Sequence, residues 1–282
     1  MLILKSGFLR MIVYSTATYS QVLQNGINSQ YLWSKTWQMD FNVSKCHTMS
    51  ITRARQRCDT QYYLGNACLS IVNSFTYLGI EISSDLRWNN HVAAVVSKAS
   101  RTLNFVRRNL YRCNSHIKEL SYITLVHPLL EYATASWDPY TACNIKDLEM
   151  VQRRAARFVG SDYRRTTSVT SLLDSLGWLS LQDRRRNARL INFLFFKARM
   201  GFPGLLHLVS DLNRHSRFTR STSCSDVPTY LQLPARTDVY KFSFLPRTIV
   251  DWNSLDIGVR GLNSLDSFRK VLVGCRSAAT CY

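Results

Sequence analysis

The sequence predicts an α+β fold, with a small antiparallel sheet near the N-terminus followed by a mainly α-helical region. Residues 48–84 contain short apolar runs bounded by turn residues, which is typical of strands. From Trp88 to about Met200, apolar residues recur at helical spacing instead. The chain has 282 residues, of which 46% are hydrophobic, so it can fill a real core and long-range disorder is not expected.

The first expected element is a helix over residues 17–39. Leu23, Ile27, Tyr31 and Trp37 recur near helical spacing within it and are expected to face inward.

The sheet region that follows contains one predicted turn and one further predicted strand. Gly65–Asn66 separates two apolar runs, and both residues tolerate positive φ, which predicts a tight hairpin turn. The segment SFTYLGIEIS is expected to form a further strand, with Tyr77, Gly79 and Glu81 on one face.

Four helices are expected after Trp88. The apolar stripe of the first, NHVAAVVSKASRTLNFVRRNLYR, consists of Val92, Val95, Val96, Ala99, Leu103, Val106 and Leu110. The second, IKELSYITLVHPLLEYATASW, should be kinked near Pro128. The third should begin at an Asn144 cap and end at Gly160, with Lys146 and the arginines facing outward. The fourth should begin at Ser180, because Ser180 and Asp183 match the spacing of a capping box at a helix N-terminus.

Composition also predicts where the chain divides. Residues 201–235 are richer in Pro, Ser, Thr and Asn and indicate a linker or long loop, after which apolar content returns around YKFSFLPRTIVDWNSL. The expected segments are 1–87, 88–200, 201–235 and a closing segment 236–282.

The net charge of +18, from 36 basic and 18 acidic residues, predicts a polyanionic partner. Nucleic acid is favoured, ahead of an anionic membrane surface and of a merely basic, solvated surface. No segment approaches the ~20 apolar residues of a membrane span, so no membrane partner is expected. The eight cysteines form no C-x-x-C pair and suit reduced thiols in an intracellular protein, in the nucleus or the cytoplasm.

Enzyme motifs are missing from the sequence. It contains no Walker-type or dinucleotide-binding glycine loop, no G-x-S-x-G and no His-Glu-x-x-His. Asp147 and Glu149 lie two apart on a helix, so they point apart and cannot share a metal ion. Glu119, Glu131 and Asp138 could converge, but the sequence gives no reason to expect it. Two-metal phosphoryl chemistry needs paired carboxylates, and no metal site is therefore predicted.

Three successive helices each carry a basic stripe opposite an apolar one. The twelve predicted nucleic-acid-binding residues are Lys98, Arg101, Arg108, Arg112, Lys146, Arg153, Arg154, Arg157, Arg184, Arg185, Arg186 and Arg189. Lys and Arg neutralise phosphates and release counterions. On a single helix, a solvated outer face would be the favoured interpretation. Three basic stripes on successive helices, with few acidic residues to compensate them, favour nucleic acid as the partner.

The segments LWSKTWQMDFNVSKC, FTYLGIEISSDLRWNNHV, KASRTLNFVRRNL, YITLVHPLLEYATASWDPY, IKDLEMVQRRAARFV, LGWLSLQDRRRNARL and FLPRTIVDWNSL carry a family resemblance. In this order they resemble the reverse transcriptase (RNA-directed DNA polymerase) of non-LTR retrotransposons (LINEs), in the jockey-like and chicken-repeat-like group. The resemblance runs from about Tyr14 to Phe268. It implies that residues 1–87 are part of a polymerase palm and that residues 88–200 form a thumb-like basic region.

The resemblance also assigns roles to a few residues. TYLGI is similar to the block that forms the primer grip, which implies that role for Tyr77, Leu78 and Gly79. Lys45 lies in a late palm block where polymerases carry a lysine near the phosphates of the incoming nucleotide. It is either a proton donor or a surface lysine after a turn, and the two interpretations stay open.

One departure from the family pattern decides the expected activity. Family members carry two aspartates before a few apolar residues and a tyrosine, and these aspartates bind Mg²⁺. In KSGFLRMIVYS, MIVYS matches the trailing part, with Tyr14 as the tyrosine, but SGFLR contains no Asp and the first carboxylate of the chain is Asp40. The remaining catalytic parts would lie upstream of Met1.

We therefore expect a truncated polymerase remnant with no cofactor of its own and no DNA synthesis as an isolated chain. Residual binding of RNA or an RNA–DNA hybrid is the second hypothesis. The alternatives are a non-catalytic scaffold for an acidic protein partner and a non-functional mobile-element fragment.

Overall fold

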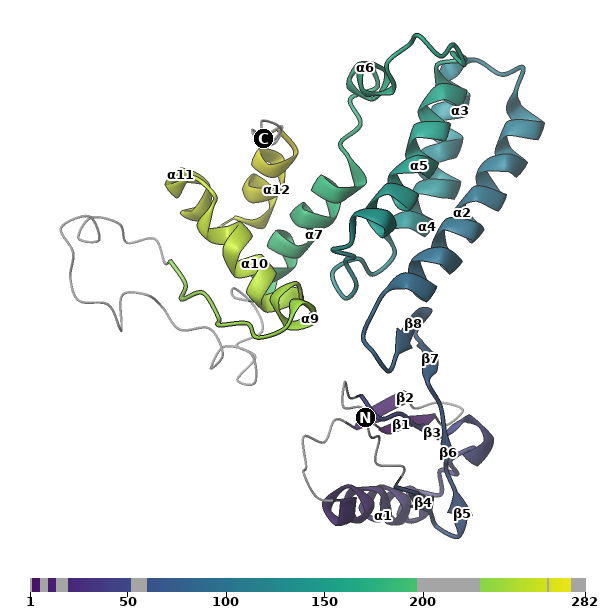
Figure 1. The fold of residues 1–282 in the computed structure, drawn as a ribbon, viewed down its shortest axis with the longest axis vertical. Coiled ribbons are helices and arrows are strands. Elements are labelled where there is room, and N and C mark those ends of the chain that lie inside the picture. Colours follow the sequence, from purple (N-terminus) through teal and green to yellow (C-terminus); the bar gives the residue numbers. More distant parts are fainter. Residues whose placement is uncertain are drawn as a thin grey trace, which may run out of the picture. The chain divides into compact units, whose positions relative to one another are not determined.

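The structure, a computed structural model, divides the chain into two compact units, residues 1–90 and residues 91–282 (Figure 1). It describes residues 2–5, 10–13, 20–51, 60–196, 229–262 and 264–274. Most of the predicted linker, residues 201–228, lies outside the described residues. The chain combines many helices with a few small sheets, so the predicted α+β class is confirmed at this level.

The largest sheet of the first unit is mixed, with strand order β2-β1-β3-β6. Its strands are β1 (Leu2–Lys5), β2 (Arg10–Val13), β3 (His47–Thr48) and β6 (Ser70–Ile71). Strand β1 pairs antiparallel with β2 and β3, whereas β3 pairs parallel with β6. The expectation of a purely antiparallel sheet is therefore wrong, because the long connection after β3 returns the chain in the same direction.

Helix α1 (Ser20–Thr36) packs over a small core of this unit. Ile27 is fully buried beside Leu64, and Leu23 and Tyr31 pack against them. Trp37 follows the end of the helix and is 64% exposed, so its predicted inward position is wrong.

The predicted hairpin at Gly65–Asn66 is confirmed by strands β4 (Tyr63–Leu64) and β5 (Ala67–Cys68). Gly65 has φ +61°, and a Cβ there would lie 2.8 Å from the ring of Tyr31. Both the turn and the close approach of the aromatic ring require glycine at this position.

The segment SFTYLGIEIS forms a hairpin, so the single strand expected there is wrong. Strands β7 (Ser74–Tyr77) and β8 (Ile80–Ser83) pair antiparallel. Leu78 and Gly79 form the turn, with φ values of +48° and +81°. Two positive φ values match the twist of a tight hairpin. A leucine at such a position costs ~1–2 kcal/mol of conformational free energy, so a turn at Leu78 is not predicted from the sequence.

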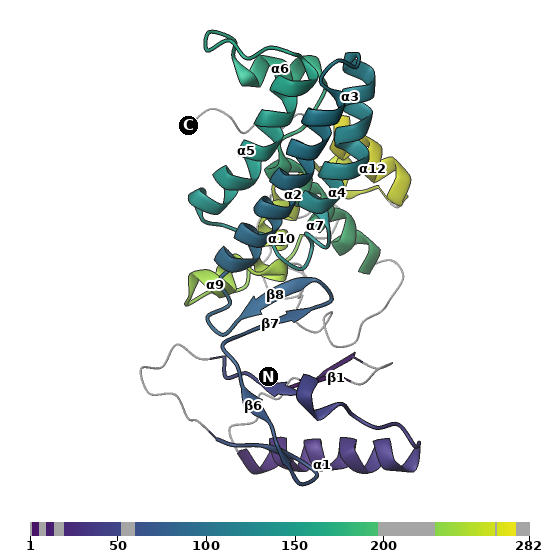
Figure 2. The same ribbon diagram turned by 90° about the vertical axis from the view of Figure 1, so that its right-hand side faces the viewer.

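In the second unit, α2 (Asn89–Leu110) and α5 (Ala142–Val159) lie alongside α3 (Ser115–Ser121) and α4 (His127–Glu131), which follow each other end to end (Figures 1 and 2). The predicted apolar stripe of α2 faces inward, since Val92, Ala99, Leu103 and Val106 are buried.

The interruption predicted near Pro128 takes the form of a π-helical segment, Tyr122–Val126, between α3 and α4. The amide of His127 donates to the carbonyl of Tyr122, five residues back. Proline has no amide hydrogen and cannot continue the ordinary α-helical pattern, so the wider turn immediately precedes it.

Some of the predicted ends of the next helices agree with the structure and one does not. Helix α5 ends at Gly160 as predicted, but it begins after Thr141, and the expected cap residue Asn144 is buried inside it. The short helix α6 (Val169–Ser175) precedes α7 (Leu181–Phe195). The Oγ atom of Ser180 accepts a hydrogen bond from the Asp183 amide at 3.0 Å, which confirms the predicted cap of α7.

The C-terminal helices are α9 (Asp238–Lys241), α10 (Phe244–Asn253), α11 (Ile257–Arg260) and α12 (Leu265–Gly274). Helices α10 and α12 pack against α7 (Figure 1). The shared core consists of Leu190, Phe193, Leu194, Tyr230, Ile249, Trp252, Phe268 and Leu272. Residues before and after the predicted linker thus stabilise one another.

Candidate nucleic-acid interface

The α2 basic face, defined here as Lys98, Arg101, Arg108 and Arg112, is exposed to solvent. Helix α2 contains no Asp or Glu, and within the described part of the chain none of the four residues forms an ion pair. The Arg112 guanidinium lies 5.3 Å from the ring centroid of Tyr111. These charges are therefore available to an anionic partner.

The predicted basic residues of α5 separate into two groups. Lys146, Arg153 and Arg154 are exposed, and the described residues offer them no ion pair. Arg157 is half-buried, and its Nη1 atom donates to the carbonyl oxygen of Arg164 at 2.9 Å. Arg157 thus holds the loop that follows the helix, whereas the other three face solvent.

The third predicted basic face consists of four arginines of α7: Arg184, Arg185, Arg186 and Arg189. The expectation that they form an exposed face is wrong for Arg185 and Arg189, which are 1% and 3% exposed. Arg185 Nε donates to Asp138 Oδ1 at 2.9 Å. Arg189 pairs with Asp138 and, through Nη2 at 2.6 Å, with Asp251. Burial lowers the pKa of both arginines to about 10, which leaves them charged at neutral pH.

The remaining arginines of α7 are also paired. Arg184 donates through Nη2 to Glu131 Oε2 at 3.0 Å, and Arg186 lies 3.4 Å from Asp251 Oδ1. Burial alone would raise the pKa of Glu131, but hydrogen bonds from His127 and Arg184 outweigh it and lower the pKa to about 2. The charges of α7 are thus used within the fold.

Asp138 is the centre of this ion-pair cluster. Its carboxylate also lies 3.0 Å from Nη1 of Arg247, a residue of α10. The cluster therefore ties α7 to the loop before α5 and to a C-terminal helix. Buried charges are stable only when they are paired, which explains why arginines that resemble an exposed stripe turn inward here.

Part of the α2 basic face borders a pocket of about 880 Å³ between α2, α3 and α5, which we call the α2–α3–α5 pocket. Its basic lining residues are Arg101, Arg107, Arg108 and Lys118. Its aromatic lining residues are Tyr111, Phe158 and Tyr163, and Asn104 and Ser161 complete the lining. No carboxylate lines the pocket, so its electrostatic potential is positive.

Lys118 is the most buried cation of this pocket, with 5% of its surface exposed. Its Nζ atom donates to Ser161 Oγ at 2.7 Å and lies 5.2 Å from the ring centroid of Phe158. Among the residues that the structure describes, it has no ion-pair partner. An ammonium group in such a place is more stable when an anion is bound beside it.

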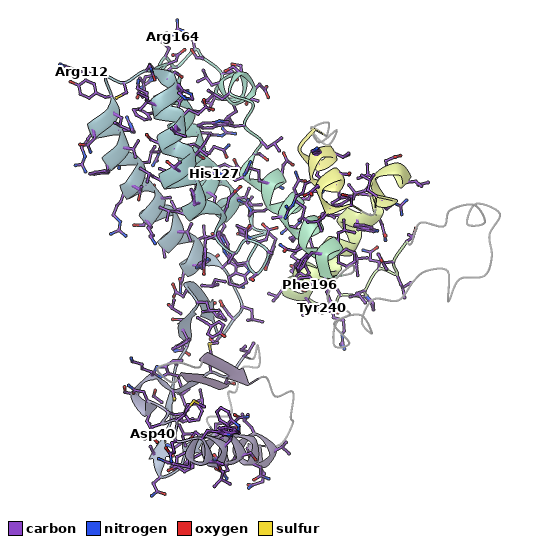
Figure 3. All side chains as sticks on the ribbon, turned by 180° about the vertical axis from the view of Figure 1, so that it is seen from behind. Asp40, Arg112, His127, Arg164, Phe196 and Tyr240 are labelled. Atoms are coloured by element: carbon purple, nitrogen blue, oxygen red, sulfur yellow. The ribbon has the colours of Figure 1, made fainter. Side chains whose placement is uncertain are left out.

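The loop after α5 that carries Ser161 and Tyr163 is organised by Asp162. Its carboxylate accepts hydrogen bonds from Arg164 Nη2 at 2.8 Å and from Thr167 Oγ1 at 2.8 Å. The hydrogen bonds from Arg164 are the main reason that the pKa of Asp162 lies well below its ordinary value. Figure 3 shows Arg164 and Arg112 at the same end of the α2–α5 helices.

The residues to which the resemblance assigns polymerase roles lie in the first unit. Lys45 is exposed at the end of a 3₁₀ turn, Val43–Lys45. Leu78 and Gly79 are exposed at the β7–β8 turn, next to the half-buried Tyr77. Their assigned roles remain predictions.

The three carboxylates that could have converged each have a different partner. Glu119 accepts a hydrogen bond from Trp178 Nε1 at 3.0 Å, whereas Glu131 pairs with Arg184 and Asp138 with Arg185. Across the described ranges, no cluster of three or more His, Cys, Asp or Glu residues could hold a metal ion.

Of the nine lining residues, only Arg101 and Arg108 are predicted from the sequence as binding residues, and the missed ones include Arg107, Tyr111, Lys118 and Tyr163. None belongs to a motif, and only the packing of three helices brings them together.

None of the described helices is long and apolar enough to cross a membrane. Comparison of the chain with models of protein families, with curated proteins and with solved structures finds no match.

Proposed function

We propose that the chain corresponds to the late palm and thumb of a non-LTR retrotransposon reverse transcriptase, that it binds nucleic acid through its helical unit and that it synthesises no DNA on its own. The sequence resemblance supports the ancestry. One observation carries the binding function: the cations of the α2 basic face, together with Lys146, Arg153 and Arg154, are exposed and form no ion pair within the described residues, whereas those of α7 are paired. Charges that the fold does not use are free to neutralise phosphates.

In the proposed correspondence, residues 5–10 take the place of the family's catalytic turn, and their sequence supports the proposed lack of activity. Residues 6–9 read SGFL, and the flanking strand residues are Lys5 and Arg10, so no carboxylate stands at this place. Two-metal phosphoryl transfer requires such carboxylates. We expect no template-dependent incorporation when purified chain is given a primed RNA template with Mg²⁺ or Mn²⁺. Incorporation above a no-template control would overturn the proposed inactivity.

The binding function is tested by removing exposed charges that do not line the pocket. We expect the triple variant Lys98→Ala/Arg112→Ala/Arg154→Ala to bind an RNA–DNA hybrid more weakly. The slope of log Kd against log salt should also fall by about one for each phosphate that the variant no longer neutralises. Fluorescence anisotropy across a salt series measures both quantities.

The matched control is Lys241→Ala/Arg269→Ala/Lys270→Ala, which removes the same charge from exposed positions on α9 and α12. Equal weakening by the two triple variants would mean that only net charge matters, and it would contradict a binding surface on α2 and α5.

A further inference from the structure

We propose that the α2–α3–α5 pocket binds one nucleotide of a single-stranded nucleic acid, with the phosphate beside the cations and the base against the aromatic rings. This inference rests on the proposed nucleic-acid binding and assigns a specific site to it. The pocket volume of about 880 Å³ falls within the ~300–1,000 Å³ range that small-molecule sites occupy.

The charge of the pocket selects an anion. Arg101, Arg108 and Lys118 line it, form no ion pair among the described residues and meet no carboxylate in the lining. Lys118 lines the pocket, is 5% exposed and uses one of its three donors on Ser161, so two donors remain for a ligand or for water. A phosphate satisfies these donors, and a guanidinium group can bind it through two parallel hydrogen bonds.

The aromatic residues add a preference for a base. Tyr111 and Tyr163 line the pocket and are 60% and 56% exposed, so their rings are accessible to a ligand. The guanidinium group of Arg107 lies 5.8 Å from the ring centroid of Tyr163. Exposed tyrosines beside arginines are typical of surfaces on which unpaired bases stack. A base in a duplex is already stacked, so this chemistry favours a single strand.

The position of the pocket explains how a strand would reach it. Arg101 and Arg108 belong both to the α2 basic face and to the pocket lining. A strand whose phosphates follow the α2 basic face would therefore pass the pocket mouth. Asp162 fixes the loop that presents Ser161 and Tyr163, so the site is largely formed before a ligand binds.

The test uses the full chain and a fluorescent oligouridine RNA. Lys118→Met removes the charge but keeps an unbranched side chain of similar length, and we expect it to weaken binding about tenfold, while Tyr163→Ala weakens it about fivefold. The controls, Lys270→Met and Tyr240→Ala, alter exposed residues away from the pocket and should change the affinity less than about twofold. Tyr163 is exposed, so Tyr163→Ala keeps the test valid if Lys118→Met fails to fold.

Three outcomes would contradict the proposal, each at a different point. Unchanged affinity of Lys118→Met and Tyr163→Ala for oligouridine would do so while leaving the proposed binding function intact, provided that the RNA–DNA hybrid still binds. An abasic strand that binds as tightly as oligouridine would overturn the role of the tyrosines. Failure of the wild-type chain to bind any nucleic acid would instead refute the proposed function.

Discussion

Asp138→Ala is expected to destabilise the helical unit by about 3–5 kcal/mol, because it breaks a buried ion-pair cluster from one side. The side chain of Asp138 is 6% exposed and pairs with Arg185, Arg189 and Arg247. Asp251 still compensates Arg189 after the substitution, but Arg185 loses its carboxylate partner. A buried guanidinium group without a partner bears the full cost of removal from water.

Urea unfolding of wild-type and variant chains, followed by circular dichroism, measures this loss as a lower midpoint at similar slope. Asp266→Ala is the control, because the side chain of Asp266 is 85% exposed and its contact with Arg269 is long, at 3.9 Å. We expect the control to change stability by less than ~1 kcal/mol. An Asp138→Ala chain as stable as the control would show that the cluster contributes nothing to stability.

Trp252→Ala is expected to cost about 3–5 kcal/mol, since it leaves a large cavity in the core that α7 shares with the C-terminal helices. Trp252 is fully buried. Its ring centroid lies 5.4 Å from that of Phe193 on α7 and 5.8 Å from that of Phe268 on α12. The cavity therefore weakens the packing of both helices at once.

The same unfolding measurement applies, with Trp37→Ala as the control because Trp37 is 64% exposed. Hydrogen exchange adds the sharper readout: amides of α7 should lose protection together with those of α10 and α12. Loss of protection confined to α10 and α12 would show that they form a separate subdomain, which contradicts a shared core.

The features that the sequence predicts correctly are those set by neighbouring residues. The apolar stripe of α2 follows the helical period, the end of α5 follows Gly160, and the start of α7 follows the Ser180 cap. The hairpin at Gly65–Asn66 follows from the freedom of glycine to adopt positive φ. Each of these signals lies within a few residues of the structure that it specifies.

The features that the sequence does not predict depend on distant partners. Arg185 looks like an exposed residue until Asp138, 47 positions earlier, is brought beside it. Lys118 and Ser161 are separated by 43 positions, and only helix packing makes them the wall of one pocket. The turn at Leu78 is missed because leucine rarely adopts positive φ. The basic pattern therefore predicts the sign of the surface but not which charges remain free.

The central claim is that exposed, unpaired cations of α2 and α5 bind nucleic acid through its phosphates. Its most direct test is the affinity of the wild-type chain for an RNA–DNA hybrid, measured by fluorescence anisotropy across a salt series. If at least four phosphates are neutralised, the affinity should fall about a hundredfold between about 50 and about 200 mM salt. An affinity that changes less than about twofold over this range would contradict the claim.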